Sequence, residues 1–147
     1  MTFCHERLDV YQLSISYIAQ VYSKASSLGG HHRHARDQWF RASQSISLNI
    51  AEGNGKATVA DRRRYFEIAR GSALECAAIQ DVLTAGKGLG SSESQKMKVD
   101  LDRIVAMLSK LGGRGYQVKE SLKPYGGEAN DYTFDPDSDT DSDTDLK

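Results

Sequence analysis

The most concentrated positive charge in the sequence is the run Arg62-Arg63-Arg64, which lies close behind Lys56 and is followed directly by Tyr65. Guanidinium and ammonium groups contact phosphate oxygens, and such contacts give salt-sensitive binding that does not depend on nucleotide sequence. Three consecutive residues of a helix fan over about 200°, so the three arginines cannot all face one surface patch. The candidate phosphate-binding residues are Arg33, Arg36, Arg41, Lys56, Arg62, Arg63 and Arg64. A solvated charged face is the alternative interpretation of this pattern.

A second set of polar residues is unusual because its members lie among alanine, serine and glycine, where helices can approach one another closely. The set consists of Asn49, Glu52, Glu67, Arg70 and Glu75. An unpaired charge between packed helices is costly, so we expect Arg70 to pair with Glu67 or Glu52. These residues are predicted to form a structural polar network that fixes the register of the helices. A ligand site and plain solvent exposure are the two alternatives.

Few other residues are arranged for chemistry. His31, His32 and His34 are clustered, but two of them are adjacent and no cysteine or acid lies at ligand spacing, which favours a solvated basic loop. Cys4 and Cys76 are too few for a disulfide framework, and no histidine lies on a helix that could activate either thiol. The sequence has neither the Glu-x-x-His pairs of a di-iron bundle nor a glycine-rich phosphate loop. We therefore predict no catalytic residue, no metal and no cofactor.

Four segments with helical periodicity must position these residues. Apolar residues recur at three- and four-residue steps, and no proline occurs before Pro124, so the chain is predicted to be all-α. The expected helices cover about 5–27, 35–53, 58–86 and 91–112. Their short connections favour an antiparallel up-down-up-down four-helix bundle.

The first of these helices carries two apolar rows. One row is a heptad-like seam that is predicted to face the core, formed by Leu8, Tyr11, Ile15, Ile18, Tyr22 and Ala25. The row beside it widens the apolar face and consists of Val10, Leu13 or Ser14, Tyr17 and Val21. The helix is therefore expected either to lie centrally or to contact another subunit as well.

The second and third helices are predicted to form a hairpin around the segment Gly53-Asn54-Gly55. Gly53 can adopt the left-handed conformation that closes a helix. Thr58, with Asp61 three residues later, is typical of a helix N-terminus. The hairpin therefore carries most of the candidate phosphate-binding residues and all of the predicted polar network.

The last part of the chain has a different composition. Residues 124–147 hold eight of the 20 acidic residues, whereas the preceding body has 18 bases against 12 acids. We predict a bundle domain at 1–123, in which weak periodicity allows a short helical extension at 115–123, and a disordered acidic tail at 124–147. The basic body indicates a polyanionic partner, or a tail that competes for the same surface.

Four sequence motifs resemble one known family. They are Leu8-Asp9-Val10-Tyr11-Gln12, Arg41-Ala42-Ser43 with Ser45-Ile46, Asn49-Ile50-Ala51-Glu52-Gly53-Asn54-Gly55-Lys56, and Ile68-Ala69-Arg70-Gly71-Ser72-Ala73-Leu74-Glu75. Through them the chain is similar, from about Phe3 to Leu111, to the four-helix-bundle proteins encoded within intervening sequences of bacterial 23S ribosomal RNA genes. The resemblance implies an antiparallel bundle that assembles into a ring-shaped homopentamer with no known enzymatic activity. A group of related fold, the accessory proteins of diversity-generating retroelements, binds nucleic acid and a reverse transcriptase through a basic pentameric surface.

These observations lead to two functional hypotheses. The first is a non-enzymatic homo-oligomeric scaffold, pentameric by resemblance, that associates with RNA, a ribonucleoprotein or a nucleic-acid-processing protein through a basic surface. The second is a protein-interaction adaptor whose acidic tail docks on a basic partner without binding nucleic acid. Since we find neither a leader sequence nor an apolar stretch of about 18 residues, we expect a cytoplasmic protein with no membrane partner.

Overall fold

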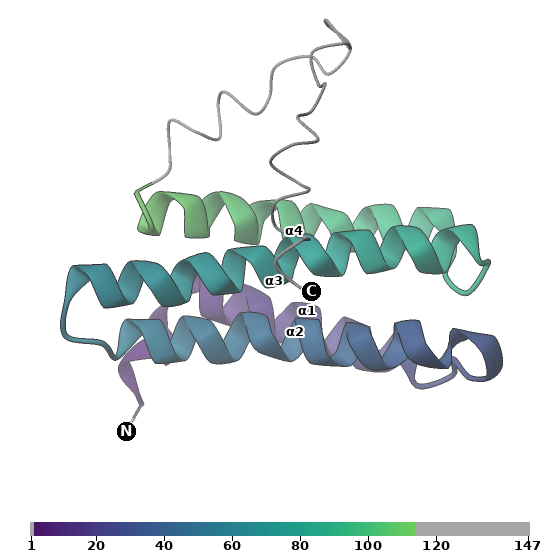
Figure 1. Ribbon diagram of the computed structural model, residues 1–147, viewed down its shortest axis with the longest axis horizontal. Helices are drawn as coiled ribbons and strands as arrows, with labels where there is room; N and C mark the ends of the chain where they lie inside the picture. Colours follow the sequence, from purple (N-terminus) through teal and green to yellow (C-terminus); the bar gives the residue numbers. More distant parts are fainter. Residues whose placement is uncertain (1, 114–147) are drawn as a thin grey trace, which may run out of the picture. The chain divides into compact units, whose positions relative to one another are not determined.

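The computed structural model describes residues 2–113, and this part of the chain consists of helices and their connections (Figure 1). The α-helices are α1 (Asp9–Ala25), α2 (Arg33–Asn54), α3 (Val59–Ala85) and α4 (Ser91–Leu111), and the short 3-10 helices η1 (Cys4–Arg7) and η2 (Gly30–His32) precede α1 and α2. Residues 2–113 contain no strand, which confirms the all-α fold class. The predicted extension at 115–123 and the predicted acidic tail at 124–147 lie outside the described residues.

Successive helices run in opposite directions, and their connections lie at alternating ends of the bundle (Figure 1). The hydrogen bonds between helices agree with this antiparallel arrangement, because increasing residue numbers on one helix pair with decreasing residue numbers on its neighbour. Between α1 and α4, Gln20 bonds Asp100 and Lys24 bonds Glu93, and between α3 and α4, Arg70 bonds Ser109 and Gln80 bonds Ser94. The helices α1 and α4 also pack against each other, so the four helices enclose one core. Within residues 2–113, none of the helices combines the length and the apolarity needed to cross a membrane.

The face of α1 that enters the core differs from the predicted seam. Tyr17 and Val21 are fully buried, whereas Ile15 and Tyr22 are 43% and 49% exposed. The predicted seam is therefore wrong at these positions, although its last member, Ala25, is fully buried. The row through Tyr17 enters the core because its polar groups find partners on other helices. Tyr22 lies instead on the flank of α1 that faces α2, where its ring packs against a phenylalanine of that helix.

A chain of hydrogen bonds crosses the core and connects all four helices. The Trp39 indole N–H donates to the Tyr17 hydroxyl at 3.0 Å, and this hydroxyl donates to Gln80 Oε1 at 2.6 Å. Gln80 Nε2 then donates to the carbonyl and hydroxyl oxygens of Ser94, each at 3.0 Å. Burial favours the neutral phenol and raises the pKa of Tyr17 well above its usual range. Because these polar groups are all paired in one register, the network disfavours sliding of one helix past another.

The connection between α2 and α3 depends on a close approach of the two helices. The helix α2 continues beyond Gly53, which has no positive φ angle, so the predicted role of Gly53 in closing the helix is wrong. A Cβ atom at Gly53 would lie 2.8 Å from the Cβ atom of Tyr65 and 3.0 Å from the ring of Phe66. Glycine is required here because α3 packs directly against it. The start of α3 matches the sequence pattern, since the Thr58 hydroxyl accepts a hydrogen bond from the Asp61 N–H at 3.1 Å.

Candidate functional site

Four of the candidate basic residues lie together where α2 meets α3. Lys56 is in the connection between the two helices, and Arg62, Arg63 and Arg64 are in the first two turns of α3; we call these four residues the hairpin cluster. Arg62 is partly buried, since its Nη1 donates to the carbonyl oxygen of the last residue of α2 at 3.1 Å and its guanidinium lies 6.0 Å from the ring centre of Phe66. This contact holds one charge of the cluster at the C-terminus of α2, where helix carbonyl groups lack partners.

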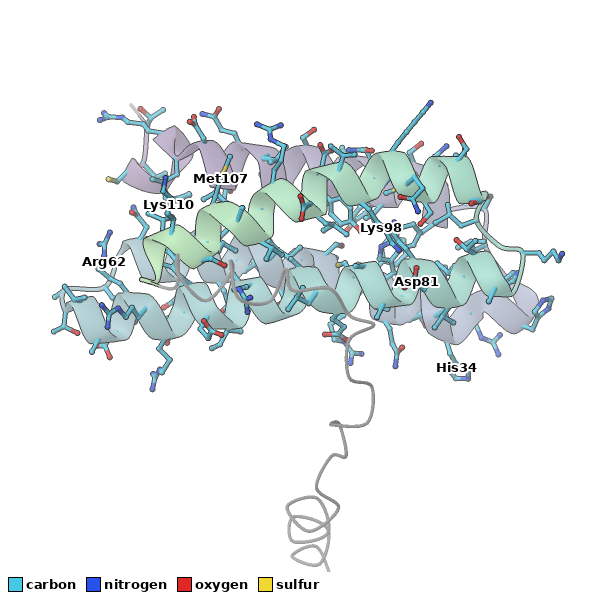
Figure 2. All side chains as sticks on the ribbon, turned by 90° about the horizontal axis from the view of Figure 1, so that it is seen from above. His34, Arg62, Asp81, Lys98, Met107 and Lys110 are labelled. Carbon is cyan, nitrogen blue, oxygen red and sulfur yellow. The ribbon has the colours of Figure 1, made fainter. Side chains whose placement is uncertain are left out.

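The other two arginines of the run point to different parts of the bundle end. Arg63 reaches the end of α4, where its Nη2 lies 3.3 Å from the position that a Cβ atom on Gly113 would occupy. Lys110, near the C-terminus of α4, is at the same end of the bundle (Figure 2). Arg64 lies over the ring of Tyr65, with 5.6 Å between its guanidinium carbon and the ring centre. The cluster therefore spreads across the bundle end from α2 to α4.

The ring of Tyr65 is contacted by two cations of the cluster. The Nζ atom of Lys56 lies 5.1 Å from the ring centre, close to the distance at which Arg64 approaches it. Lys56 also forms an ion pair with Glu52, with 3.2 Å between Nζ and Oε2. The hydrogen bond to the Glu52 carboxylate, followed by the nearby Tyr65, raises the pKa of Lys56. The charge of Lys56 is thus partly balanced inside the cluster.

The remaining three candidate basic residues lie away from the hairpin cluster. Arg33 and Arg36 are in the first turn of α2, and Arg41 is in its third turn. An α-helix rises about 1.5 Å per residue, so the first turn of α2 lies roughly 30 Å from the connection to α3. Arg36 is also engaged locally, because it donates to the Leu28 carbonyl oxygen at 2.8 Å and pairs with Asp37 at 3.1 Å. The structure therefore brings four of the seven candidates together and places the other three elsewhere.

The residues of the predicted histidine loop are helical, since His31 and His32 lie in η2 and His34 lies in the first turn of α2, at the end of the bundle opposite the hairpin cluster (Figure 2). The ring centres of His31 and His32 are 4.2 Å apart. A Cβ atom on Gly88 would lie only 2.9 Å from the His32 ring, so His32 packs on the connection between α3 and α4. Among residues 2–113, no three His, Cys, Asp or Glu side chains are placed to hold a metal ion.

The residues of the predicted polar network do not form one connected group. Asn49 Nδ2 donates to the carbonyl and hydroxyl oxygens of Ser45 at 2.8 and 3.0 Å. The Ser45 hydroxyl lies 2.8 Å from the hydroxyl of Ser72, which links α2 to α3. Glu52 pairs instead with the lysine of the hairpin cluster, and Glu75 is exposed on α3. Asn49 and Glu52 therefore make separate local contacts, whereas Glu75 lies on the surface.

Arg70 links α3 to α4. Its Nη1 lies 3.8 Å from Glu67 Oε2, which is the first of the two partners expected from the sequence, and its Nε donates to the buried Ser109 hydroxyl at 2.9 Å. The longer network that joins all four helices involves Tyr17 and Gln80, which the sequence interpretation did not select as polar partners. The sequence does contain a signal for them, because each is a residue with a polar group at a position of an apolar row with three- and four-residue steps.

Four helices packed around one core, with basic residues gathered at one end, define a four-helix-bundle protein. The chain belongs to the 23S rRNA-intervening sequence protein family, whose model matches residues 6–110, and this confirms the resemblance identified from the sequence motifs. The matched region includes the whole hairpin cluster.

Comparison with solved structures supports the same fold. The chain is similar to the crystal structure of a protein of unknown function from the S23 ribosomal protein family of Bacteroides thetaiotaomicron VPI-5482, with 19% sequence identity and a TM-score of 0.66. The alignment covers 70% of this chain and 97% of the other. A search of curated proteins finds no match.

Proposed function

We propose that this protein is a non-enzymatic homo-oligomeric scaffold that associates with RNA or a ribonucleoprotein through the hairpin cluster. The observation that carries the proposal is the gathering of Lys56, Arg62, Arg63 and Arg64 at one end of the bundle. In the part of the chain that the structure describes, no ion pair involves any of these arginines, so the exposed guanidinium groups of Arg63 and Arg64 are available to phosphate oxygens, whereas Arg62 is engaged at the end of α2. The resemblance in fold to the accessory proteins of diversity-generating retroelements, which bind nucleic acid through a basic surface, supports a nucleic acid as the polyanion.

Self-association is the second part of the proposal. Large apolar side chains are exposed on every helix, and they include Ile15, Tyr22, Leu48, Ile68, Leu74, Val82 and Val99. Leu74 and Val99 also line a groove of about 480 Å³ between α3 and α4. Exposed apolar surface of this kind is typical of subunit contacts. When one face of a subunit binds a different face of the next subunit, the subunits form a closed ring if the rotation between neighbours adds up to one full turn. The family resemblance supports a ring of five subunits.

A salt titration tests the RNA-binding part. We expect the logarithm of the association constant for a structured RNA to fall linearly with the logarithm of salt concentration, with a slope of about −0.7 to −0.9 per phosphate contact. The double variant Arg63→Glu and Arg64→Glu should remove most of this binding. Its matched control, Arg33→Glu with Arg41→Glu, makes the same charge change on the separated arginines and should bind nearly as wild type. A slope near zero for the full chain and for a chain lacking residues 125–147 would refute RNA binding.

The oligomeric state has its own test. Light scattering at micromolar concentration should give a particle mass five times the 16.2 kDa of one chain. A particle with the mass of a single chain would refute the proposal that the protein forms a homo-oligomer.

The acidic residues of the C-terminal sequence favour one alternative. A protein-interaction adaptor could use Asp135 to Asp145, in which every second residue is acidic, to dock on a basic protein partner. In that case no RNA would bind at any salt concentration, and removal of residues 125–147 would abolish capture of a basic model protein. If removal of these residues instead tightens RNA binding, the acidic sequence competes with RNA for the hairpin cluster.

A further inference from the structure

Tyr65 occupies a different environment from the aromatic residues of the core. Its Cβ atom packs at the position of Gly53, while its side chain remains partly exposed at the bundle end. Phe66, the next residue, is buried with 3% exposure. Two cations lie over the Tyr65 ring, Lys56 at 5.1 Å and Arg64 at 5.6 Å. An accessible aromatic ring is thus placed at the centre of the hairpin cluster.

We propose that Tyr65 is a stacking site for one unpaired base of single-stranded RNA, and that Arg64 contacts a phosphate next to that base. This inference rests on the proposed function, because it names the form of RNA that the hairpin cluster recognises. An aromatic ring can stack on any unpaired base, whereas the faces of bases in a duplex are covered by their neighbours. The site therefore distinguishes unpaired from paired nucleotides, and it has little preference among the bases.

The contacts of the two cations explain how the ring becomes available. Cation–π contacts at exposed positions are weak, and Arg64 is exposed. Its guanidinium can therefore leave the ring for a phosphate oxygen while a base takes its place. Lys56 is held differently, because its ion pair with Glu52 keeps it beside the ring. Arg64 is thus the cation that leaves the ring, whereas the ion pair with Glu52 favours retention of Lys56 beside the stacked base.

The charges around Tyr65 favour a phosphate in spite of two carboxylates. Among Lys56, the three arginines and the two carboxylates Glu52 and Asp61, two positive charges remain in excess. The N-terminus of the long helix α3 adds the partial positive charge of its first turn. Asp61 offsets part of this charge, which places the strongest phosphate contact at Arg64 rather than at the very start of the helix.

The experiment measures fluorescence anisotropy with the full-length chain and two labelled probes, an oligouridylate of about 12 nucleotides and an RNA duplex of about 12 base pairs. The wild-type chain should bind the single strand more tightly. Tyr65→Ala should raise the Kd for the single strand roughly 5- to 150-fold, the effect expected for loss of one stacked base, and should change the Kd for the duplex less than about twofold. Tyr65→Phe keeps the aromatic face and should bind as wild type does.

Two more variants separate stacking from packing. Tyr65→Leu keeps apolar contact with Gly53 but has no aromatic face, so it should match Tyr65→Ala in RNA binding while retaining more thermal stability. Phe40→Leu removes an aromatic ring from α2, away from the hairpin cluster, while keeping an apolar side chain there, and should leave both Kd values unchanged. Equal binding of the single strand by Tyr65→Leu and Tyr65→Phe would overturn the inference, as would tighter binding of the duplex by the wild-type chain.

The outcomes also distinguish this inference from the proposed function. If Arg63→Glu with Arg64→Glu abolishes RNA binding while every Tyr65 variant binds as wild type does, the stacking site is refuted and the RNA-binding scaffold stands. If the wild-type chain binds neither probe, both fail. Tighter binding of a thymidine DNA strand than of the oligouridylate would overturn the assignment to RNA.

Discussion

Replacement of Gly53 by alanine should destabilise the bundle, although alanine is the better helix former. Gly53 lies inside α2, where the change from glycine to alanine would by itself gain about 1 kcal/mol. The new Cβ atom, however, would lie 2.8 Å from the Tyr65 Cβ and 3.0 to 3.1 Å from the ring of the buried Phe66. Neither neighbour is the flexible end of a side chain, so the helices must move apart. Such overpacking costs about 1–3 kcal/mol, and after subtraction of the gain in helix propensity we expect a net loss of up to about 2 kcal/mol.

Gly71 provides a matched control for this substitution. It also lies inside a helix, α3, but it is exposed, and a Cβ atom there would meet no atom within 4 Å. Gly71→Ala should therefore show only the gain in helix propensity and stabilise the protein by about 0.5–1 kcal/mol. The two substitutions are chemically identical and are expected to have opposite signs because their surroundings differ.

Urea denaturation followed by circular dichroism measures both effects. The comparison requires one fixed protein concentration, since dissociation of an oligomer would contribute to the apparent stability. Thermal unfolding should separate the melting temperatures of the two variants by up to roughly 15 °C, with wild type between them. If Gly53→Ala is as stable as Gly71→Ala, the close approach of α3 to α2 at Gly53 is not tight and our account of the hairpin is wrong.

Three further predictions concern buried and charged groups. Tyr17→Phe leaves the buried Gln80 amide oxygen without its donor and should destabilise the bundle by about 1–3 kcal/mol in urea denaturation, whereas an unchanged midpoint would show that the network is dispensable. Burial raises the pKa of the Cys76 thiol to about 12, so near pH 8 a thiol reagent should label only the exposed Cys4 of the folded chain. A hydrogen bond from a lysine on α1 lowers the pKa of Glu93, so its contribution to stability is present above the unfolded-state pKa and is lost as pH falls through the folded-state value. As the pH is lowered, the melting temperature of Glu93→Gln should therefore fall less than the melting temperature of the wild-type chain.

The four α-helices could be predicted from the sequence because their signals are local, whereas the short 3-10 helices η1 and η2 were not predicted. Three- and four-residue spacing, the lack of proline and the Thr58 cap each depend on a few neighbouring residues. The face of α1 that enters the core could not be chosen in this way. Apolarity favours the row through Ile15, but Tyr17 is buried instead because Trp39 and Gln80, on two other helices, satisfy its hydroxyl. That information is absent from the sequence of α1 itself.

The candidate site was predictable only in part for a similar reason. The arginine run from 62 to 64 is contiguous and therefore visible, whereas its grouping with Lys56 depends on the geometry of the hairpin. Arg33 could have been separated from Lys56 on length alone, since a helix of 22 residues spans about 33 Å. Tyr65 gave no signal beyond its place after the run, because its exposure depends on how α3 crosses Gly53.

The close approach at Gly53 also connects the fold to the candidate site. Lys56 is attached to the end of α2 by its ion pair with Glu52, whereas Tyr65 belongs to α3. The 5.1 Å between the Lys56 ammonium and the Tyr65 ring therefore measures how closely the two helices meet. If α3 moved outward to admit a Cβ atom at position 53, the ring would move away from Lys56. The arrangement of ring and cation thus depends on helix packing, and the proposed stacking site, if preorganised in this way, should lose less conformational entropy on binding.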